Sequence, residues 1–363
     1  MLEYVTRGRY MLKNVKKYNV LILLIILVLS FTTLSAANQL KVHYIDVGQG
    51  DSILIEVPDS YSMLIDGGPK SEANKLVSYL EKLRINKINY VVSTHPHTDH
   101  IGGLLTVLND FEVEKIIDSG KIHTSQTYED YLTLIDTKSI PYKLGRKGDK
   151  IYLGEAEFTV LHPDNTELDI NNSSIVLLMK YGKTRFIFMG DSEREAENEI
   201  LSSNKVIRAH FLKVGHHGSN TSTSKDFLEK VSPQVAIIMC GSDNSYGHPH
   251  IETINKLMEK EIKVYRTDKN GTIILSTDGN SFSTTIQYSN NEIKGKKEET
   301  NSSSNANKDN KVFVGSKESD KYHYPNCRWV EKILEKNKIW FSSVNDAKKA
   351  GYKPCGTCKP PAN

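Results

Sequence analysis

The chain has 363 residues, of which 25% are charged and 38% hydrophobic, with 23 glycines, 11 prolines and four cysteines. This composition excludes a disordered chain, a collagen-like chain and a multi-span membrane protein. The net charge of +3 is unevenly distributed: residues 1–37 carry +4, residues 38–288 carry −7 and residues 289–363 carry +6. Such an asymmetry indicates segments with separate roles.

The first 37 residues have the three parts of a secretory signal. A basic flank ends at Lys17, residues 20–29 are apolar, and small residues follow at 35–37. This order predicts export, with the segment either cleaved as a signal peptide or retained as an N-terminal anchor. The chain is therefore expected to be secreted or anchored on the outer side of the cytoplasmic membrane, with membrane contact only through its N-terminus.

The rest of the chain predicts strands first, and strands mixed with helices later. Strands are expected at residues 41–46, 52–57, 62–66, 90–94, 158–161, 175–180, 184–189, 211–214, 235–239, 263–266, 272–276 and 284–287. Helices are expected at residues 71–83, 103–108, 193–201, 224–230 and 250–260. This order fits an α/β domain over residues 38–288, in which layered sheets are covered by helices.

A polar segment and a small cysteine-containing segment follow this domain. Residues 289–311 contain one Ile among mostly polar residues, which is the composition of a flexible linker. Residues 312–363 contain aromatic residues and three of the four cysteines. The sequence therefore predicts a second, compact domain at residues 312–363.

Four potential metal ligands lie directly after the predicted strand 90–94. They are His95, His97, Asp99 and His100. Imidazoles suit zinc and manganese, and a carboxylate adds negative charge. A loop with this spacing can direct alternate side chains toward two neighbouring cations. The pattern predicts a metal site, because packing alone does not account for it.

The spacing His-x-His-x-Asp-His after a strand resembles the metal-binding signature of the metallo-β-lactamase fold. Three further segments resemble motifs of that fold and occur in the family's order: Leu-Ile-Asp-Gly-Gly at 64–68, Phe-Met-Gly-Asp at 188–191 and Val-Gly-His-His-Gly-Ser at 214–219. The resemblance covers about residues 40–288. It implies an α/β fold, the αβ/βα sandwich of this family.

Two segments resemble a narrower group within that fold. Asp-Val-Gly-Gln-Gly-Asp-Ser at 46–52 and Tyr-Gly-His-Pro-His at 246–250, together with the His-His-Gly-Ser segment, resemble the extracellular hydrolase domain of ComEC-type DNA-uptake proteins. The resemblance implies a binuclear centre, with a hydroxide between the two metals as nucleophile.

The resemblance also implies a role for individual residues. The expected metal ligands are His95 and His97 for the first ion, Asp99, His100 and His216 for the second, and Asp191 as the bridge. The expected catalytic residues are Asp99, which orients or deprotonates the water, and His248, the acid for the leaving oxygen. The expected substrate contacts are Gly48, Gln49, Gly50, His217, Gly218 and Ser219.

Three points stay open at this stage. His217 is the alternative to His216 as a ligand, and His216 is favoured because it comes first after the strand. Asp66 either braces the metal loop or serves structure alone. No His occurs between Pro163 and Gly190, where many members of the fold have another ligand. Fewer imidazoles leave zinc and manganese both open as the divalent ions.

The C-terminal segment carries a second set of metal ligands. His323, Cys327, Cys355 and Cys358 provide one imidazole and three thiolates, a closed tetrahedral set for a structural zinc ion. The segment resembles the Ada-type metal-binding domain. A disulfide from Cys355 to Cys358 or to Cys327 is the alternative. The basic, aromatic character of this segment suggests nucleic-acid or cell-wall binding, and a solvated basic surface remains the other interpretation.

The combined features favour an exported metal hydrolase that acts as a phosphodiesterase, specifically a DNA nuclease. One alternative keeps the hydrolase and changes its substrate to a phosphocholine ester, a lactone or a β-lactam. Another is a non-catalytic DNA-binding or tethering factor. The expected partners are DNA and, in addition, the cell wall or membrane-tethered uptake machinery.

Overall fold

The computed structural model describes residues 39–287 except 165–166, 204–205 and 243, and residues 313–360 except 326, 328, 331, 342 and 359. The predicted export segment 1–37 and the predicted linker 289–311 lie outside the described residues. Among the described helices, none is both long enough and apolar enough to cross a bilayer.

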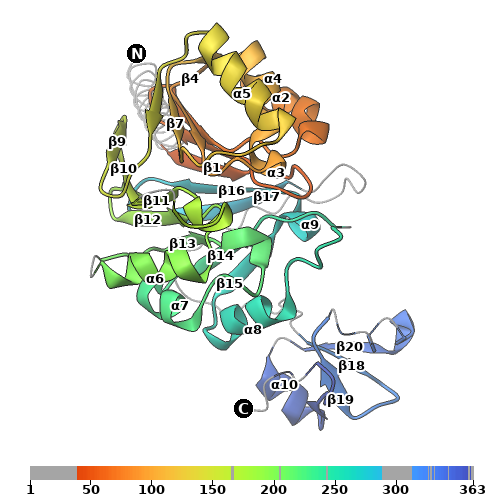
Figure 1. The fold of residues 1–363 in the computed structure, drawn as a ribbon. Coiled ribbons are helices and arrows are strands. Elements are labelled where there is room, and N and C mark those ends of the chain that lie inside the picture. The colour runs from red at the N-terminus through yellow and green to blue at the C-terminus, as the bar shows by residue number, and fades with distance from the viewer. Residues whose placement is uncertain are drawn as a thin grey trace, which may run out of the picture. The chain divides into compact units, whose positions relative to one another are not determined.

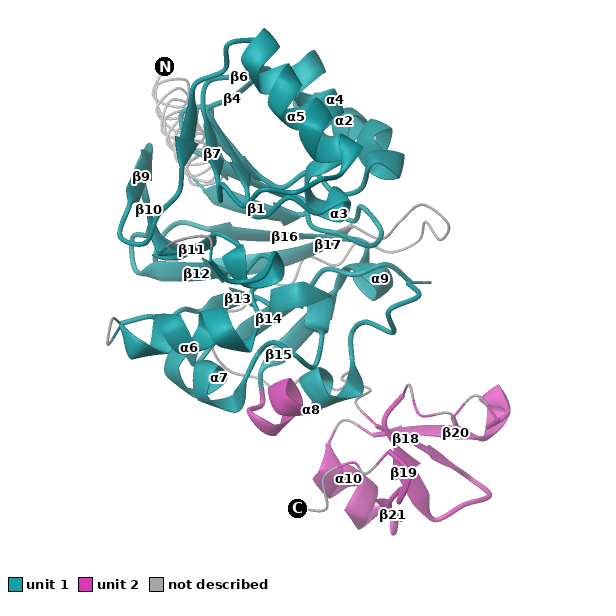
Figure 2. Ribbon diagram, in the orientation of Figure 1, with its two compact units in different colours: residues 1–254, 262–300 teal, residues 255–261, 301–363 magenta. Residues whose placement is uncertain are grey.

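Two compact units divide the chain (Figure 2). One contains residues 1–254 and 262–300, and the other contains residues 255–261 and 301–363.

The larger unit is built on two sheets that pack face to face (Figure 1). In spatial order the first sheet contains β17 (Phe282–Gln287), β16 (Thr272–Thr277), β1 (Leu40–Tyr44), β2 (Ile53–Val57), β3 (Tyr61–Ile65), β5 (Tyr90–Ser93), β7 (Ile116–Asp118) and β8 (Tyr142–Leu144). The second contains β15 (Lys263–Arg266), β14 (Val235–Ile238), β13 (Phe211–Lys213), β12 (Thr184–Phe188), β11 (Val176–Tyr181), β10 (Ala156–His162) and β9 (Lys150–Leu153).

Each sheet is antiparallel in one half and parallel in the other. In the first sheet, β3, β5, β7 and β8 are parallel, and in the second sheet β12 to β15 are parallel. Parallel strands need crossover connections, which are helices here. The parallel strand β14, Val-Ala-Ile-Ile, is buried at every position, as expected for a strand covered on both faces.

Helices cover the outer face of each sheet (Figure 1). The helices over the first sheet are α2 (Ala73–Lys82), α4 (Leu104–Asp110) and α5 (Gln126–Thr137). The helices over the second sheet are α6 (Arg194–Ser202) and α7 (Lys225–Val231). Helix α8 (Ile251–Glu259) is divided between the two units. Shorter elements are α3 (Thr98–Ile101), α9 (Thr267–Asn270) and the paired strands β4 (Lys87–Ile88) and β6 (Glu112–Val113).

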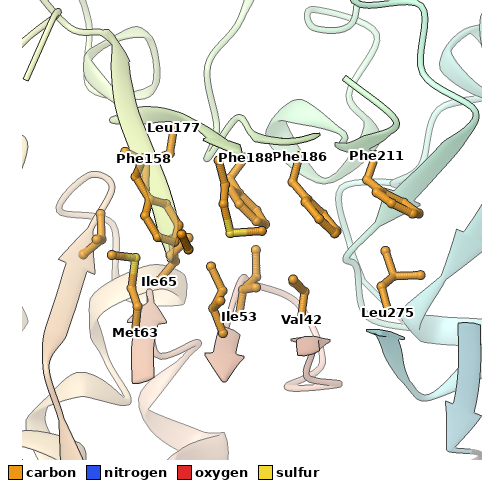
Figure 3. Packing of buried hydrophobic residues seen from close by; sticks show 14 of the residues in the cluster. Val42, Ile53, Met63, Ile65, Phe158, Leu177, Phe186, Phe188, Phe211 and Leu275 are labelled. Atoms are coloured by element: carbon orange, nitrogen blue, oxygen red, sulfur yellow. The ribbon is translucent and has the colours of Figure 1, made fainter. Parts of the chain in front are cut away.

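The main hydrophobic core lies between the two sheets (Figure 3). Val42, Ile53 and Met63 of the first sheet face Phe158, Phe186 and Phe188 of the second. Alternation along β2 and β3 directs the neighbouring Leu54 and Leu64 to the opposite face, where they join a second core under the helices. The two cores fix the positions of the sheets, and the strand ends therefore have defined places.

The described residues from 313 onward in the smaller unit form a four-stranded sheet with an α-helix beside it. The sheet order is β20 (Lys338–Phe341), β18 (Phe313–Ser316), β19 (Lys321–His323) and β21 (Lys353–Pro354), and the helix is α10 (Val344–Lys349). Its small core contains Val314, Val330 and two cysteine side chains, Cys327 and Cys355. A core of this size needs an additional stabilising element.

All the strands predicted for the larger unit are present, most of them with shifted ends, and so are the five predicted helices. The elements that were not predicted are β7, β8, β9 and α5, together with the short α3, α9, β4 and β6. The short β7 has three residues between polar neighbours. Helix α5 buries only Tyr128, Tyr131 and Ile135, so its apolar face is narrow.

Candidate metal centre

The potential ligands of the large unit come from the ends of three strands. His95 to His100 follow β5 in the first sheet and lead into α3. Asp191 follows β12, and His216 and His217 follow β13, both in the second sheet. The strand order therefore brings together side chains that are far apart in the sequence, at one edge of the sandwich.

The carboxylate of Asp191 lies at the centre of this group. Its Oδ2 atom is 3.3 Å from His100 Nε2, 3.3 Å from His217 Nε2, 3.9 Å from His95 Nε2 and 4.0 Å from His216 Nε2. His97 Nδ1 is 3.0 Å from His95 Nε2. Asp99 Oδ2 is 3.3 Å from His217 Nε2 and 4.0 Å from His100 Nε2. The predicted ligands of the metal loop thus converge with those of the second sheet.

Hydrogen bonds orient two of these rings. His100 Nδ1 donates to Asp66 Oδ2 over 2.8 Å, and His217 Nδ1 donates to the carbonyl of Met239 over 3.0 Å. With Nδ1 engaged in this way, each ring turns its Nε2 atom toward Asp191, where it can be offered to a cation. A metal-bound histidine commonly has this arrangement.

Asp66 is itself fixed by Thr94, at the end of β5. Its carboxylate accepts from the Thr94 amide over 2.8 Å and from the Thr94 hydroxyl over 2.6 Å. Burial raises the pKa of Asp66, although the neighbouring His100 opposes this shift. Asp66 therefore holds both the metal loop and the ring of His100.

Several buried polar atoms of this cluster have no hydrogen-bond partner among the described residues. They are Nε2 of His100, Nε2 of His217, Oδ1 of Asp51 and Oδ1 of Asp191. One potential ligand atom from each of these four residues lies within 4.8 Å of the others. Unpartnered buried polar groups are rare in folded proteins, and imidazole and carboxylate are ligands for divalent cations. The residues therefore fit a metal ion.

The pKa values of the cluster reflect this concentration of charge. Burial opposes the charge on Asp191, but His217 and His100 hold the pKa of Asp191 well below its ordinary value. Burial lowers the pKa of His95 well below the ordinary value, and the nearby His100 adds to this. An ionised, buried carboxylate surrounded by imidazoles is a favourable place for a cation.

Two members of the site, Asp51 and Lys213, were not named as site residues from the sequence. Lys213 is buried at the end of β13 and contacts the carboxylate of Asp51. Its ammonium group also donates to the carbonyl of Gly190 over 3.1 Å and lies 4.0 Å from Asp191 Oδ1. The signals in the sequence are the position of Asp51 in the motif at 46–52 and, for Lys213, a charged residue within the apolar strand 211–214.

The two adjacent histidines after β13 occupy different places. Both have left-handed backbone conformations, with φ values of 46° at His216 and 52° at His217. His217 is buried within the cluster, whereas the His216 side chain is 23% exposed and its Nδ1 lies 2.6 Å from Glu193 Oε1. The sequence favoured His216 as the ligand, and the structure places His217 Nε2 closer to Asp191 Oδ2, at 3.3 Å against 4.0 Å for His216 Nε2.

The ring of His248 lies beside the cluster, with its centroid 5.3 Å from that of His216 and 6.1 Å from that of His217. Burial lowers the pKa of His248 to about 4, and the neighbouring His217 and His216 contribute. At neutral pH the ring is therefore neutral and keeps a single N–H.

The expected phosphate contacts are largely engaged within the protein. Gly48 N donates to Asp46 Oδ1, Gln49 Oε1 accepts from the Gly241 amide, and Ser219 N donates to the His216 carbonyl. A Cβ atom on Gly50 would lie 2.2 Å from the Asp99 carbonyl oxygen, and one on Gly218 would lie 2.6 Å from Pro249 Cβ. Gly50 thus permits close approach of its turn to the metal loop, and Gly218 permits close approach to Pro249.

The asparagine-rich segment supports the second sheet's part of the site. Asn171 Nδ2 donates to Glu193 Oε1 over 3.2 Å, and Asn172 Oδ1 accepts from the amides of Glu193 and Ala196. Asn171 Oδ1 is buried and has no partner among the described residues. Where many members of the fold have a histidine, this chain provides amide groups.

The smaller unit brings its four expected ligands together. One ligand atom each from His323, Cys327, Cys355 and Cys358 lies within 4.8 Å of the others. In the described part of the chain the cysteines are free thiols, and His323 Nδ1 is buried without a partner. Three thiols and one imidazole form a closed set for zinc.

Comparison with known families identifies both domains. Residues 45–242 match the model of the metallo-beta-lactamase superfamily, and residues 297–361 match the metal binding domain of Ada. The chain therefore belongs to the metallo-β-lactamase superfamily and carries a C-terminal Ada-type zinc-binding domain. Both resemblances inferred from the sequence, and the expected fold, are confirmed.

The chain is also similar in sequence to three curated proteins. The chain is 33% identical to ComE operon protein 3 of Bacillus subtilis over 64% of this chain and 32% of that protein. It is 30% identical to Recombination protein 2 of Haemophilus influenzae over 72% of this chain and 32% of that protein. It is 27% identical to Competence protein ComA of Neisseria gonorrhoeae over 65% and 32%, respectively. The chain thus spans about one third of the length of these relatives.

Proposed function

We propose that this chain is an exported binuclear-metal phosphodiesterase that cleaves DNA. The observation that carries the proposal is the position of Asp191, whose Oδ2 atom lies within 4.0 Å of four imidazole nitrogens. A buried carboxylate shared by this many potential ligands is suited to bridge two divalent cations.

We assign the ligands from these contacts. His95 and His97 would hold the first ion, Asp99, His100 and His217 would hold the second, and Asp191 would offer its carboxylate to both. Either zinc or manganese is compatible with this mixed set of nitrogen and oxygen atoms. When bound, two such ions lower the pKa of a water molecule and polarise a phosphoryl group.

The protein's own groups prepare this chemistry. The Asp99 side chain is 32% exposed, so one side of its carboxylate is accessible to the attacking water, whose proton it accepts. Asp66 and the carbonyl of Met239 hold His100 and His217 in fixed orientations. The neutral ring of His248 offers a hydrogen bond to a substrate oxygen.

Two observations support DNA as the substrate. One relative bears the name Competence protein, and the motifs at 46–52, 214–219 and 246–250 resemble those of DNA-uptake hydrolase domains. In addition, residues 289–363 carry a net charge of +6, which favours contact with a polyanion. Export rests on the composition of residues 1–37.

A nuclease assay tests the proposal. The purified chain, supplied with Mn²⁺ or Zn²⁺, is expected to cleave DNA, and His97→Ala and Asp191→Asn are expected to abolish cleavage. His210→Ala is the matched control, because His210 lies before β13, at the opposite end of this strand from the cluster.

Other outcomes would identify the alternatives. Hydrolysis of a phosphocholine ester, a lactone or a β-lactam without cleavage of DNA would replace the substrate and keep the hydrolase. DNA binding with no hydrolysis of any phosphodiester would leave a tethering factor. Binding of a single metal ion per large unit would contradict the two-ion mechanism.

A further inference from the structure

Imidazole rings form a continuous row through the site of the large unit. Successive ring centroids are separated by 5.7 Å (His123–His97), 4.7 Å (His97–His95), 4.1 Å (His95–His100), 5.2 Å (His100–His217), 6.1 Å (His217–His248) and 4.9 Å (His248–His250). The proposed metal ligands occupy the middle of this row. His123 and His250 occupy its two ends.

The two end rings, His123 and His250, carry their ring proton on Nε2, whereas His100 and His217 donate from Nδ1. The amide of Ser125 donates to His123 Nδ1 over 3.2 Å, and the amide of Asn220 donates to His250 Nδ1 over 2.9 Å. Because Nδ1 accepts in both rings, the ring proton is on Nε2. These two rings therefore present N–H donors and have no Nε2 lone pair for a cation, in contrast to His100 and His217.

Both end rings belong to loops that are held in place. The loop of His123 is anchored where Gly120 N donates to Asp118 Oδ1 over 2.6 Å and Arg146 donates to the Ser119 carbonyl over 2.8 Å. The amide of His250 donates to the Gly218 carbonyl over 3.0 Å, next to the cluster. Donors fixed in this way can bind a ligand without a large ordering cost.

An exposed aromatic ring lies beside the second end of the row. Tyr246 is 65% exposed, and its ring is nearly parallel to that of His248, with centroids 5.7 Å apart and an angle of 19°. His248 is nine-tenths buried, and its Nδ1 has no partner among the described residues. Exposed aromatic rings near a phosphate site commonly stack on nucleic-acid bases.

We propose that His123 and His250 bind phosphate groups on either side of the scissile bond, and that Tyr246 stacks on a base of the same strand. The site then takes an extended nucleic-acid strand rather than a small phosphate ester. This inference rests on the proposed function. It specifies the substrate as a nucleic-acid strand that contacts the His123 end of the row, the metal centre and the His250 end.

The test compares substrates of different length. The full chain is assayed with a long single-stranded oligonucleotide and with a dinucleotide, which has only the scissile phosphate. For His123→Ala and for His250→Ala, the ratio of kcat/KM between the long and the short substrate is expected to fall about tenfold, mainly through KM, because each loses one hydrogen bond to an anion. Tyr246→Ala is expected to lower the same ratio, and Tyr246→Phe to preserve it.

Matched variants separate binding from damage to the fold. His123→Gln and His250→Gln retain a donor in a similar place and are expected to recover part of the lost ratio. In His210 the Nδ1 atom also accepts a backbone amide, that of Arg185 over 3.1 Å, yet the residue precedes β13 at the far end of that strand. His210→Ala is therefore expected to leave the ratio unchanged.

Two results would overturn the inference. One is an equal loss of activity on both substrates, and the other is loss of a bound metal ion in His123→Ala or His250→Ala. If the unmodified chain cleaves neither substrate, the proposed function fails, and binding of a labelled oligonucleotide, followed by fluorescence anisotropy, decides this inference separately. Weaker binding by the two alanine variants supports it, and unchanged binding rejects it.

Discussion

The nitrogen that carries the ring proton distinguishes the proposed metal-binding histidines from those proposed to bind phosphate. His100 and His217 donate from Nδ1 to Asp66 and to the Met239 carbonyl, whereas His123 accepts at Nδ1 from Ser125. The partner of one nitrogen thus decides whether the other presents a lone pair or a proton. The neighbouring carboxylates and carbonyls are therefore as important for the site as the histidines themselves.

Asp66→Asn tests whether the carboxylate of Asp66 orients the ring of His100 for metal binding. The carboxylate accepts three hydrogen bonds, two from Thr94 and one from His100, and an amide cannot accept all of them. We expect metal affinity to fall about 10- to 100-fold, measured by titration calorimetry. Asp118→Asn is the matched control, because Asp118 is a buried carboxylate at the end of β7 outside the cluster. Equal losses of affinity would show a general effect on the fold.

Lys213→Met tests how the buried ammonium group beside the cluster contributes to stability. The ammonium group contacts Asp51 and lies 4.0 Å from Asp191 Oδ1, so its removal takes the main counter-charge from the buried carboxylate of Asp51. We expect the metal-free protein to lose about 3 kcal/mol or more of its unfolding free energy. The loss should be smaller with saturating Mn²⁺, because the metal replaces part of the missing charge. Denaturant titrations with and without metal measure both values, and an identical loss in the two would contradict this role.

Sequence reasoning identified the residues that lie close together in the chain. His95, His97, Asp99 and His100 occupy one loop, so their spacing alone indicates a metal site. The pair Asp51 and Lys213 could not be found in this way, because the two residues meet only after the sheets have packed. The choice between His216 and His217 depends on two successive left-handed residues, which no local pattern indicates.

At the scale of elements, strand ends decide which residues meet. The predicted strands were confirmed because their apolar runs are long and buried on one or both faces. Strand β7 has three residues, and β8 is exposed throughout, so neither has a clear pattern. The loop of His123 lies between β7 and α5, two of the elements that were not predicted. This end of the imidazole row was therefore missed.

Gly50→Ala tests the contact between the turn after β1 and the metal loop. The added Cβ atom would lie 2.2 Å from the Asp99 carbonyl oxygen, at a φ of 139°, next to the hydrogen bond from the Asp51 amide to the same oxygen. We expect a loss of at least about 2 kcal/mol in unfolding free energy, together with weaker metal binding.

Gly48→Ala provides the control for this prediction. Gly48 also has a positive φ, of 69°, but its Cβ atom would have nothing within 4 Å. We expect a loss of about 1 kcal/mol from backbone strain alone, with unchanged metal binding. Similar losses for the two variants in chemical denaturation would show that close approach to Asp99 is unimportant.

At the scale of the whole molecule, the chain combines an acidic hydrolase domain with a basic zinc-binding domain. Residues 38–288 carry −7 and residues 289–363 carry +6. The two domains present different sets of metal ligands: the closed Cys and His set leaves no position for water, whereas the Asp191 cluster includes a partly exposed carboxylate, Asp99. We therefore expect the smaller domain to contribute affinity for DNA rather than cleavage.

Cys355→Ser tests this division of roles. Loss of one thiolate opens the closed set, so we expect the variant to lose the zinc ion of the smaller domain and the folded structure that depends on it. DNA binding should weaken and depend less steeply on salt, while hydrolysis of a small phosphodiester should persist. Metal analysis and binding titrations at several salt concentrations provide the readouts. Cys240→Ser, in the core of the larger unit, should retain this zinc ion. Unchanged DNA binding by Cys355→Ser would assign the affinity to the hydrolase domain.

The ligands of the large unit come from both layers of the sandwich. His95, His97, Asp99 and His100 follow a strand of one sheet, and Asp191 and His217 follow strands of the other. A bound ion would therefore act as a removable cross-link between two layers that otherwise adhere through their apolar core. The layers could separate only after a ligand had dissociated, which would slow unfolding. In a medium that contains proteases, the ions that provide the chemistry would also set the lifetime of the folded enzyme.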